Sequence, residues 1–144
     1  MSTEQMAKRK GGCLCGAVRY EINGSLPKVV YCHCEQCRKT SGHYVAATAV
    51  DIDDLNMTED AGLTWYESSK TAKRGFCKIC GSSIFWAPAH GKYMGVMAGP
   101  IDAPTGLSSR EHIYTSDASD YYEITDGLPQ FEQNHPDLWE DNDA

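Results

Sequence analysis

The sequence predicts a mainly β domain of short strands arranged around metal sites. Short apolar or alternating stretches recur between Gly, Pro and Asn turns, and none of them has a strong helical period. Seven cysteines lie in three close groups. Bound metal would add the order that a small core lacks, because metal-binding energy becomes folding energy. The 144 residues fit one domain, since domains of about 100–150 residues are the commonest.

The first strand is expected at residues 17–22. Residues 1–10 before it lack apolar periodicity, and we expect them to be disordered. Val18, Tyr20 and Ile22 alternate with other residues, so a strand would place them on one face.

A second strand is expected at residues 28–34, after a turn at 23–25. Because side chains alternate along a strand, Cys32 and Cys34 should face one side and His33 the other. This geometry argues against His33 as a ligand of a metal that those cysteines bind. It favours a partly buried packing or hydrogen-bonding role.

The rest of the chain predicts further strands joined by polar connections. Strands are expected at 43–50, 63–66, 83–86, 92–97 and 112–114, with a hairpin turn at 88–91. The acidic stretch 51–60 is expected to be a connection, the basic stretch 70–75 a mobile loop, and 132–144 an acidic tail. The domain itself is therefore expected to span residues 11–131.

The spacing of the cysteines predicts two zinc sites. Thiolates suit Zn²⁺ at about 2.3 Å, and closely spaced pairs let two sulfurs reach one ion. Seven thiolates divide into a closed set of four, typical of a structural site, and an open set of three, typical of a catalytic site. The open site with three thiolates is expected to be only partly occupied by zinc. The cysteines are Cys13, Cys15, Cys32, Cys34, Cys37, Cys77 and Cys80.

Spacing alone leaves a second grouping open. Cys34 and Cys37 together with Cys77 and Cys80 would form a zinc ribbon, and this grouping also satisfies tetrahedral coordination by sulfur. A third interpretation takes Cys32, Cys34 and Cys37 as a redox switch with one reactive thiol. Disulfide bonds are less expected than metal in such close pairs in a reducing compartment.

The distribution of charged and apolar residues argues against nucleic acid and membranes as partners. Residues 101–144 hold one basic and eleven acidic residues, whereas residues 1–100 hold twelve basic and nine acidic residues. Nucleic-acid binding is disfavoured, because a phosphate backbone requires a strong basic surface. We expect no membrane span, no signal peptide and a cytoplasmic location. Arg38 and Lys39 could contact a small anionic substrate.

Three cysteine motifs together resemble one known family. They are followed by His112-Ile-Tyr and by Asp126-Gly-Leu-Pro129, and the match runs in order over about residues 11–131. The cysteine motifs are Gly11-Gly-Cys-Leu-Cys-Gly, Cys32-His-Cys-Glu-Gln-Cys-Arg-Lys-Thr-Ser-Gly42 and Arg74-Gly-Phe-Cys-Lys-Ile-Cys-Gly-Ser-Ser-Ile-Phe85. Together these motifs resemble the glutathione-dependent formaldehyde-activating enzyme / centromere protein V family.

The resemblance implies a β-tent fold and a division of the cysteines. Cys13, Cys15, Cys77 and Cys80 would hold a structural zinc, and Cys32, Cys34 and Cys37 a catalytic zinc. It implies a carbon–sulfur lyase or synthase that joins glutathione to formaldehyde, with a small thiol adduct as substrate. The alternative is a non-catalytic zinc module for protein interaction or metal buffering, with His43 or another side chain as fourth ligand. The sequence does not indicate an oligomeric state.

Overall fold

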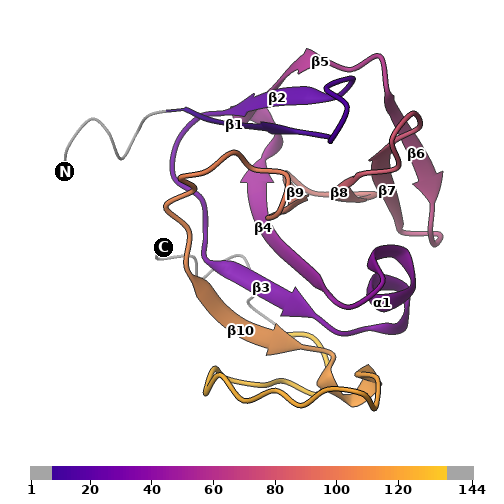
Figure 1. Cartoon of the computed structure of the whole chain (residues 1–144), viewed down its shortest axis with the longest axis vertical. Coiled ribbons are helices and arrows are strands. Elements are labelled where there is room, and N and C mark those ends of the chain that lie inside the picture. The colour runs from indigo at the N-terminus through magenta and orange to yellow at the C-terminus, as the bar shows by residue number, and fades with distance from the viewer. Residues whose placement is uncertain (1–7, 136–144) are drawn as a thin grey trace.

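The fold is mainly β, as the sequence predicts. The computed structural model describes residues 8–135 (Figure 1). In this part of the chain, ten strands form two sheets. The strands are β1 Arg9–Gly12, β2 Arg19–Ile22, β3 Val29–Cys32, β4 Val45–Asp51, β5 Leu55–Glu59, β6 Leu63–Glu67, β7 Ala72–Cys77, β8 Ser83–Pro88, β9 Tyr93–Met97 and β10 Ser109–Ile113. The helical turns are α1 Glu35–Ser41, η2 Ile52–Asp54 and η3 Thr115–Asp117.

The two sheets differ in size. The smaller has the order β1-β2-β5, and the larger has the order β10-β3-β4-β9-β8-β7-β6. Every pairing is antiparallel except that of β10 with β3, which is parallel. The β8–β9 pairing confirms the hairpin expected from the sequence. The parallel pair brings the chain after residue 113 to the end of β3 where Cys32 lies, because Ile113 is opposite Cys32.

The main core lies where the smaller sheet packs on the larger one. Val18, Tyr20 and Ile22 are at most 1% exposed and belong to it, which agrees with the predicted alternation. Phe85 packs its ring 5.5 Å from that of Tyr20 and 6.0 Å from that of Trp65. Apolar burial at these positions holds the two sheets together.

A small satellite core lies on the other face of the larger sheet. It contains Cys37, Val45 and Met97, with Cys32, Cys34, Ala47 and Trp86 packed against it. Successive residues of β9 point to opposite faces, so Val96 joins the main core and Met97 the satellite core. The larger sheet therefore separates the two apolar regions.

Two stretches expected to be connections are strands. Residues 51–60 contain η2 and β5, and β5 pairs with β2 at the edge of the smaller sheet. Leu55 and Met57 pack on the main core while acidic neighbours face solvent, and those neighbours made the stretch read as a loop. Residues 70–75 run into β7, whose Arg74 and Gly75 are buried.

The sequence also failed to predict the helix α1. The helix has only seven residues, too few to show a helical period in the sequence. Its ends are marked by Cys34 as the N-cap and by Gly42 as a left-handed C-cap with φ 91°, and Lys39 pairs with Glu35 one turn earlier. Because α1 begins at Glu35, the strand predicted for 28–34 ends at Cys32.

The ends of the described chain differ from the expected domain boundaries. β1 begins at Arg9, inside the stretch 1–10 expected to be disordered, and residues 1–7 lie outside the described part. Residues 132–135 of the expected tail bond to β10 and η3, since His135 Nδ1 lies 2.6 Å from Glu111 Oε2 and the Ser116 hydroxyl donates to Glu132 O at 2.8 Å. Residues 136–144 lie outside the described residues. Within residues 8–135 there is no helix of the length and hydropathy that a bilayer crossing requires.

Truncation of Phe85 should destabilise the fold strongly. Phe85→Ala removes a ring that is 1% exposed from the junction of the two sheets, so the free energy of unfolding should fall by about 3–5 kcal/mol. Tyr66→Ala is the control, because Tyr66 is 62% exposed, and it should cost less than about 0.5 kcal/mol. Denaturant unfolding of metal-loaded protein measures both changes. Equal losses would contradict this location of the core.

Candidate metal centres

The first candidate centre is the four-sulfur cluster of Cys13, Cys15, Cys77 and Cys80. All four sulfurs lie within 4.8 Å of one another. The Cys13 and Cys15 sulfurs are 3.7 Å apart, and those of Cys15 and Cys77 are 3.8 Å apart. Tetrahedral bonds of about 2.3 Å to zinc would separate the sulfurs by about 3.8 Å. The donor set and its spacing therefore fit a closed tetrahedral site.

Backbone amides surround this cluster. Val18 N donates to the sulfur of Cys13 at 3.2 Å, and Ile79 N donates to that of Cys77 at 3.4 Å. The hydroxyl and backbone of Ser82 lower the pKa of Cys80 to about 5. These donors favour the thiolate forms that metal binding requires.

Gly62 connects the two halves of the four-sulfur cluster. Its N–H donates to Ala17 O at 2.9 Å, and its carbonyl accepts from Lys78 N at 2.8 Å. A Cβ at this position would lie 2.8 Å from the Cys77 sulfur and 2.7 Å from the Ala17 Cβ. Glycine is thus required by the close approach of the two cysteine turns.

The second candidate centre is the three-sulfur cluster of Cys32, Cys34 and Cys37. Cys32 ends β3, Cys34 caps α1, and Cys37 lies in the first turn of α1, where it is 6% exposed. Cys37 N donates to the Cys34 sulfur at 3.3 Å. Their sulfurs lie within 4.8 Å of one another, and no His, Asp or Glu of residues 8–135 belongs to the group. This part of the chain supplies three ligand atoms, one fewer than a tetrahedral ion takes.

Charge is unevenly shared among these three sulfurs. Hydrogen bonds from Cys32 and Cys37 lower the pKa of Cys34 to about 2. Hydrogen bonds with Cys34 and Cys37 raise the pKa of Cys32. The group is suited to stabilising anionic sulfur at Cys34, and a bound cation would extend this to all three.

Two further residues lie beside the three-sulfur cluster. Burial and the sulfur charges of Cys32 and Cys34 raise the pKa of Tyr114, which has a left-handed backbone at φ 56°. Arg74 donates from Nη2 to the Cys37 sulfur at 3.7 Å. In the sequence, Arg74 lies in the same motif as Cys77 and Cys80. The His112-Ile-Tyr motif is a sequence signal that Tyr114 belongs to the site. For Arg74 the sequence signal is the alternation of side chains along β7, which places Arg74 on the opposite face from Cys77.

The structure groups the cysteines as the resemblance implies and not as a zinc ribbon. All seven thiols are free of disulfide bonds. Cys34 and Cys37 lie with Cys32, away from Cys77 and Cys80.

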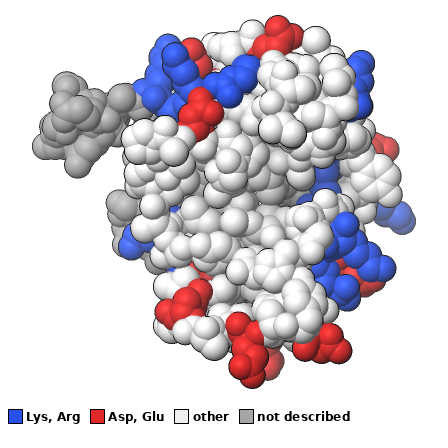
Figure 2. Space-filling model, viewed as in Figure 1, with Lys and Arg blue, Asp and Glu red and all other residues white. Residues whose placement is uncertain are grey.

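The basic residues of α1 lie at its exposed side. Lys39 Nζ pairs with Glu35 Oε2 at 3.4 Å, and Arg38 Nε donates to Asp117 O at 3.3 Å. Figure 2 shows Lys and Arg side chains gathered over α1, and Asp and Glu gathered below over the loop after β10. In the described chain no hydrogen bond or ion pair joins Arg38 or Lys39 to a sulfur, so substrate binding by them stays a prediction.

His33 lies in a buried hydrogen-bond network on the other side of β3 from the sulfurs. Its Nε2 lies 2.8 Å from His112 Nδ1, and His112 Nε2 lies 2.8 Å from Asp126 Oδ2. Its Nδ1 lies 2.5 Å from the Tyr122 hydroxyl. His33 is 0% exposed, and burial followed by the charge of His112 lowers its pKa to about 4. The hydrogen-bonding role predicted for His33 is the one observed.

With the imidazoles of His33 and His112 both neutral, the donor and the acceptor of each hydrogen bond in the network are fixed. The Asp126 carboxylate can only accept, so His112 carries its proton on Nε2 and offers Nδ1 to His33 Nε2–H. Tyr122 O–H then donates to His33 Nδ1. His43, expected as a possible fourth ligand, bonds through Nδ1 to the Tyr121 hydroxyl instead.

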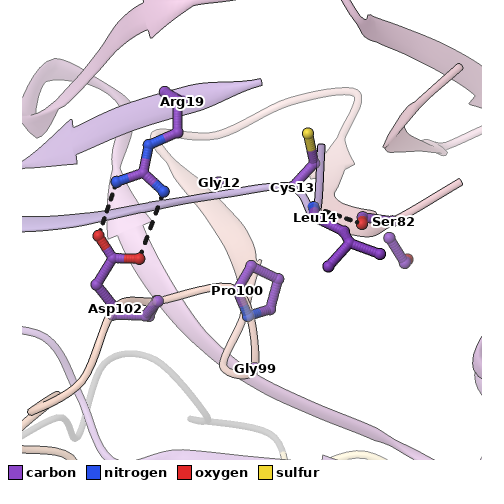
Figure 3. Close-up of a pocket in the computed structure, with 10 residues that line it drawn as sticks. Gly12, Cys13, Leu14, Arg19, Ser82, Gly99, Pro100 and Asp102 are labelled. Atoms are coloured by element: carbon purple, nitrogen blue, oxygen red, sulfur yellow. Dashed lines mark hydrogen bonds and ion pairs between the residues drawn. The ribbon is translucent and has the colours of Figure 1, made fainter. Parts of the chain in front are cut away.

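An open pocket of about 440 Å³ lies beside the four-sulfur cluster (Figure 3). Arg19 and Asp102 form its polar wall, with Arg19 Nη2 2.7 Å from Asp102 Oδ2. Leu14 and Ser82 line the opposite side, where Leu14 N donates to the Ser82 hydroxyl at 3.1 Å. No residue of the three-sulfur cluster lines this pocket. It is therefore separate from the site with the incomplete ligand set.

A sequence model of the family described as glutathione-dependent formaldehyde-activating enzyme matches residues 8–117. The chain belongs to this family. The match covers all seven cysteines and Arg74. Tyr121, Tyr122 and Asp126 lie beyond it.

Two known proteins are similar to this family member. A Schizosaccharomyces pombe (strain 972) protein described as an uncharacterized lyase is 35% identical over 88 residues, which make up 60% of this chain. The chain spans about 63% of that relative's length. A crystal structure of a Rhodobacter sphaeroides protein has a TM-score of 0.56 and 23% identity, covering 85% of this chain and 98% of that one. At this identity the likeness concerns the fold alone.

Substitution of Gly62 should weaken metal binding at the four-sulfur cluster. In Gly62→Ala the new methyl group would overlap the Cys77 sulfur and Ala17, so the two cysteine turns must move apart. We expect the free energy of unfolding to fall by about 1–3 kcal/mol and chelators to remove metal faster. Gly99→Ala is the control, because a Cβ there meets nothing within 4 Å. A variant that keeps wild-type metal retention would contradict this role.

Loss of the Tyr122 hydroxyl should be costly and loss of the Tyr121 hydroxyl should not. Tyr122→Phe leaves the buried Nδ1 of His33 without a donor, at a cost of about 1–3 kcal/mol in unfolding free energy. Tyr121→Phe removes the exposed bond to His43, and solvent replaces it. Thermal and denaturant unfolding of both variants gives the comparison. If both variants were equally stable, the inferred direction of the network would be wrong.

Proposed function

We propose that the protein is a zinc-dependent carbon–sulfur lyase or synthase that acts on a thiol adduct at the three-sulfur cluster. Cys32, Cys34 and Cys37 would hold the catalytic zinc, and Cys13, Cys15, Cys77 and Cys80 a structural zinc. By family, the adduct is of the glutathione–formaldehyde type, S-hydroxymethylglutathione. The observation that carries the proposal is the contrast between a complete set of four sulfur ligands and a neighbouring set of three.

The residues present fit zinc at both clusters. Sulfur-only donor sets suit Zn²⁺, and the sulfur separations of 3.7 and 3.8 Å in the four-sulfur cluster suit tetrahedral bonds. At the three-sulfur cluster the ion would favour the thiolate form of an incoming thiol and act as a Lewis acid.

The reaction requires the thiol sulfur to form a bond with the carbonyl carbon. The π pair of the carbonyl group moves to its oxygen, and the thiol proton ends on that oxygen; the lyase direction reverses these steps. The satellite core surrounds the cysteines with Val45, Met97 and Trp86, which exclude water from this side of the site. Electrostatic interactions in such a setting are stronger than in water.

Tyr114 is the group that we propose holds the transferred proton. Burial and nearby sulfur charge raise its pKa, so its hydroxyl stays protonated at neutral pH and can donate a hydrogen bond. The two histidines nearest to these cysteines in the sequence are otherwise engaged. His33 bonds to His112 and Tyr122, and His43 bonds to Tyr121.

A non-catalytic zinc module is the competing function. It requires a protein side chain as the fourth ligand of the three-sulfur cluster, for which His43 was the leading candidate. The bond from His43 to Tyr121 gives this alternative no support.

Metal analysis combined with turnover tests the proposal. Freshly purified protein should carry two zinc ions per chain and catalyse adduct formation from glutathione and formaldehyde, or from a related thiol and aldehyde. Cys34→Ser should lower zinc to one per chain and reduce turnover by at least about 100-fold, with the fold retained. Cys13→Ser should instead lose thermal stability, because it breaks the four-sulfur cluster. Zinc-loaded protein that is inert towards a broad panel of thiols and aldehydes would sink the lyase proposal.

A further inference from the structure

Arg74 is a buried cation without a carboxylate partner. It lies in β7 between the exposed Lys73 and the buried Gly75, and it is 7% exposed. No carboxylate of residues 8–135 pairs with it, and its Nη2 donates to Gln36 Oε1 at 3.3 Å. A buried, unpaired guanidinium is costly, because desolvation is not offset. Its counter-charge must come from elsewhere in the site.

The three-sulfur cluster supplies that counter-charge. Arg74 Nη2 lies 3.7 Å from the Cys37 sulfur and donates to it. Three thiolates and one divalent ion sum to −1, and Arg74 brings the sum to zero. Four thiolates and one divalent ion sum to −2. The three-sulfur cluster would therefore be balanced by a buried cation that donates to one of its sulfurs.

One donor of this guanidinium remains unused. Arg74 Nε is buried and has no hydrogen-bond partner in the described chain. In a planar guanidinium, Nε–H lies on the same edge as Nη2, and Nη2 is the atom that faces Cys37. A buried N–H that lacks an acceptor is unfavourable, so a ligand oxygen at this edge would satisfy it. Nε–H is thus a free cationic donor next to the sulfurs, and a charged donor of this kind is suited to an oxyanion.

We propose that Arg74 forms an oxyanion-binding site beside the three-sulfur cluster. This inference rests on the proposed function, and it assigns the oxygen that changes charge in the reaction. When the thiol sulfur bonds to the aldehyde carbon, the π pair moves to the carbonyl oxygen, and Arg74 Nε–H donates to that oxygen until it takes the thiol proton. A fixed cationic donor aimed at developing charge stabilises the transition state more than the ground state.

The test compares two small thiols that share a two-carbon skeleton. Mercaptoacetate carries a carboxylate near its sulfur, and 2-mercaptoethanol carries a neutral hydroxyl. Titration of Co²⁺-loaded protein, followed by its sulfur-to-cobalt absorption, gives a dissociation constant for each. Wild type should bind mercaptoacetate on the order of tenfold more tightly, as expected for a hydrogen bond to a charged group. Arg74→Met should bring the ratio of the two constants to about one.

Lys73→Met is the matched control. It removes one positive charge from the position just before Arg74 on the same strand. There Lys73 Nζ lies 4.4 Å from the centroid of the Trp65 ring. A general electrostatic attraction of mercaptoacetate would be lost equally in both variants, whereas an Arg74 site predicts that Lys73→Met keeps the wild-type ratio. If Arg74→Met fails to fold or to bind cobalt, Arg74→Lys decides, because it keeps a cation but lacks the Nε–H edge and should also lose the preference.

The outcomes separate this inference from the proposed function. Loss of the preference in the Arg74 variants alone supports the oxyanion site, even if glutathione and formaldehyde do not react. A preference that persists in Arg74→Met or Arg74→Lys overturns the oxyanion site, even if turnover is intact.

Discussion

Negative charge on closely spaced sulfur is the constraint on which the structure depends. Four cysteine sulfurs from two turns, with Cys15 and Cys77 separated by 62 residues, converge to distances of 3.7 and 3.8 Å. Thiolates at this spacing repel one another unless a cation lies among them. Because Cys13 follows β1 of the smaller sheet and Cys77 ends β7 of the larger one, neutralising this charge also fastens one sheet to the other. The closure of so long a loop adds to the stabilisation that metal would give.

The larger sheet keeps the two sulfur clusters in different surroundings. Cys13 and Cys77 belong to the main core, whereas Cys37 belongs to the satellite core on the other face. β7 connects them, since it carries Arg74 toward one cluster and Cys77 toward the other. A buried cation donates to the three-sulfur cluster, whereas backbone amides and a serine hydroxyl donate to the four-sulfur cluster. This difference fits the catalytic and structural roles that we propose for the two clusters.

The cysteine spacing and strand alternation were enough to predict the mainly β fold, the buried face of β2 and the opposite orientation of His33. Those features follow from local rules that apply wherever a strand has one buried face. β5 and β7 were missed because their polar residues read as loops. In β7 the polar residue is an arginine buried by a sulfur cluster, a long-range contact that no local pattern contains. The pairing of His112 with Asp126 and the parallel β10–β3 contact are likewise set by tertiary packing, although both residues lie in motifs that the sequence displayed.

The histidine network joins the span that matches the family to the segment that follows it. His33 and His112 lie within the span that matches the family, but their partners Tyr122 and Asp126 lie in the segment that follows it. The end of the matched span leads into that segment, and it lies beside the sulfurs at Tyr114 and reaches α1 through Asp117. A relative could therefore exchange this single stretch and acquire a new specificity while its two cysteine clusters stayed intact. Diversification of substrates would require no redesign of the scaffold.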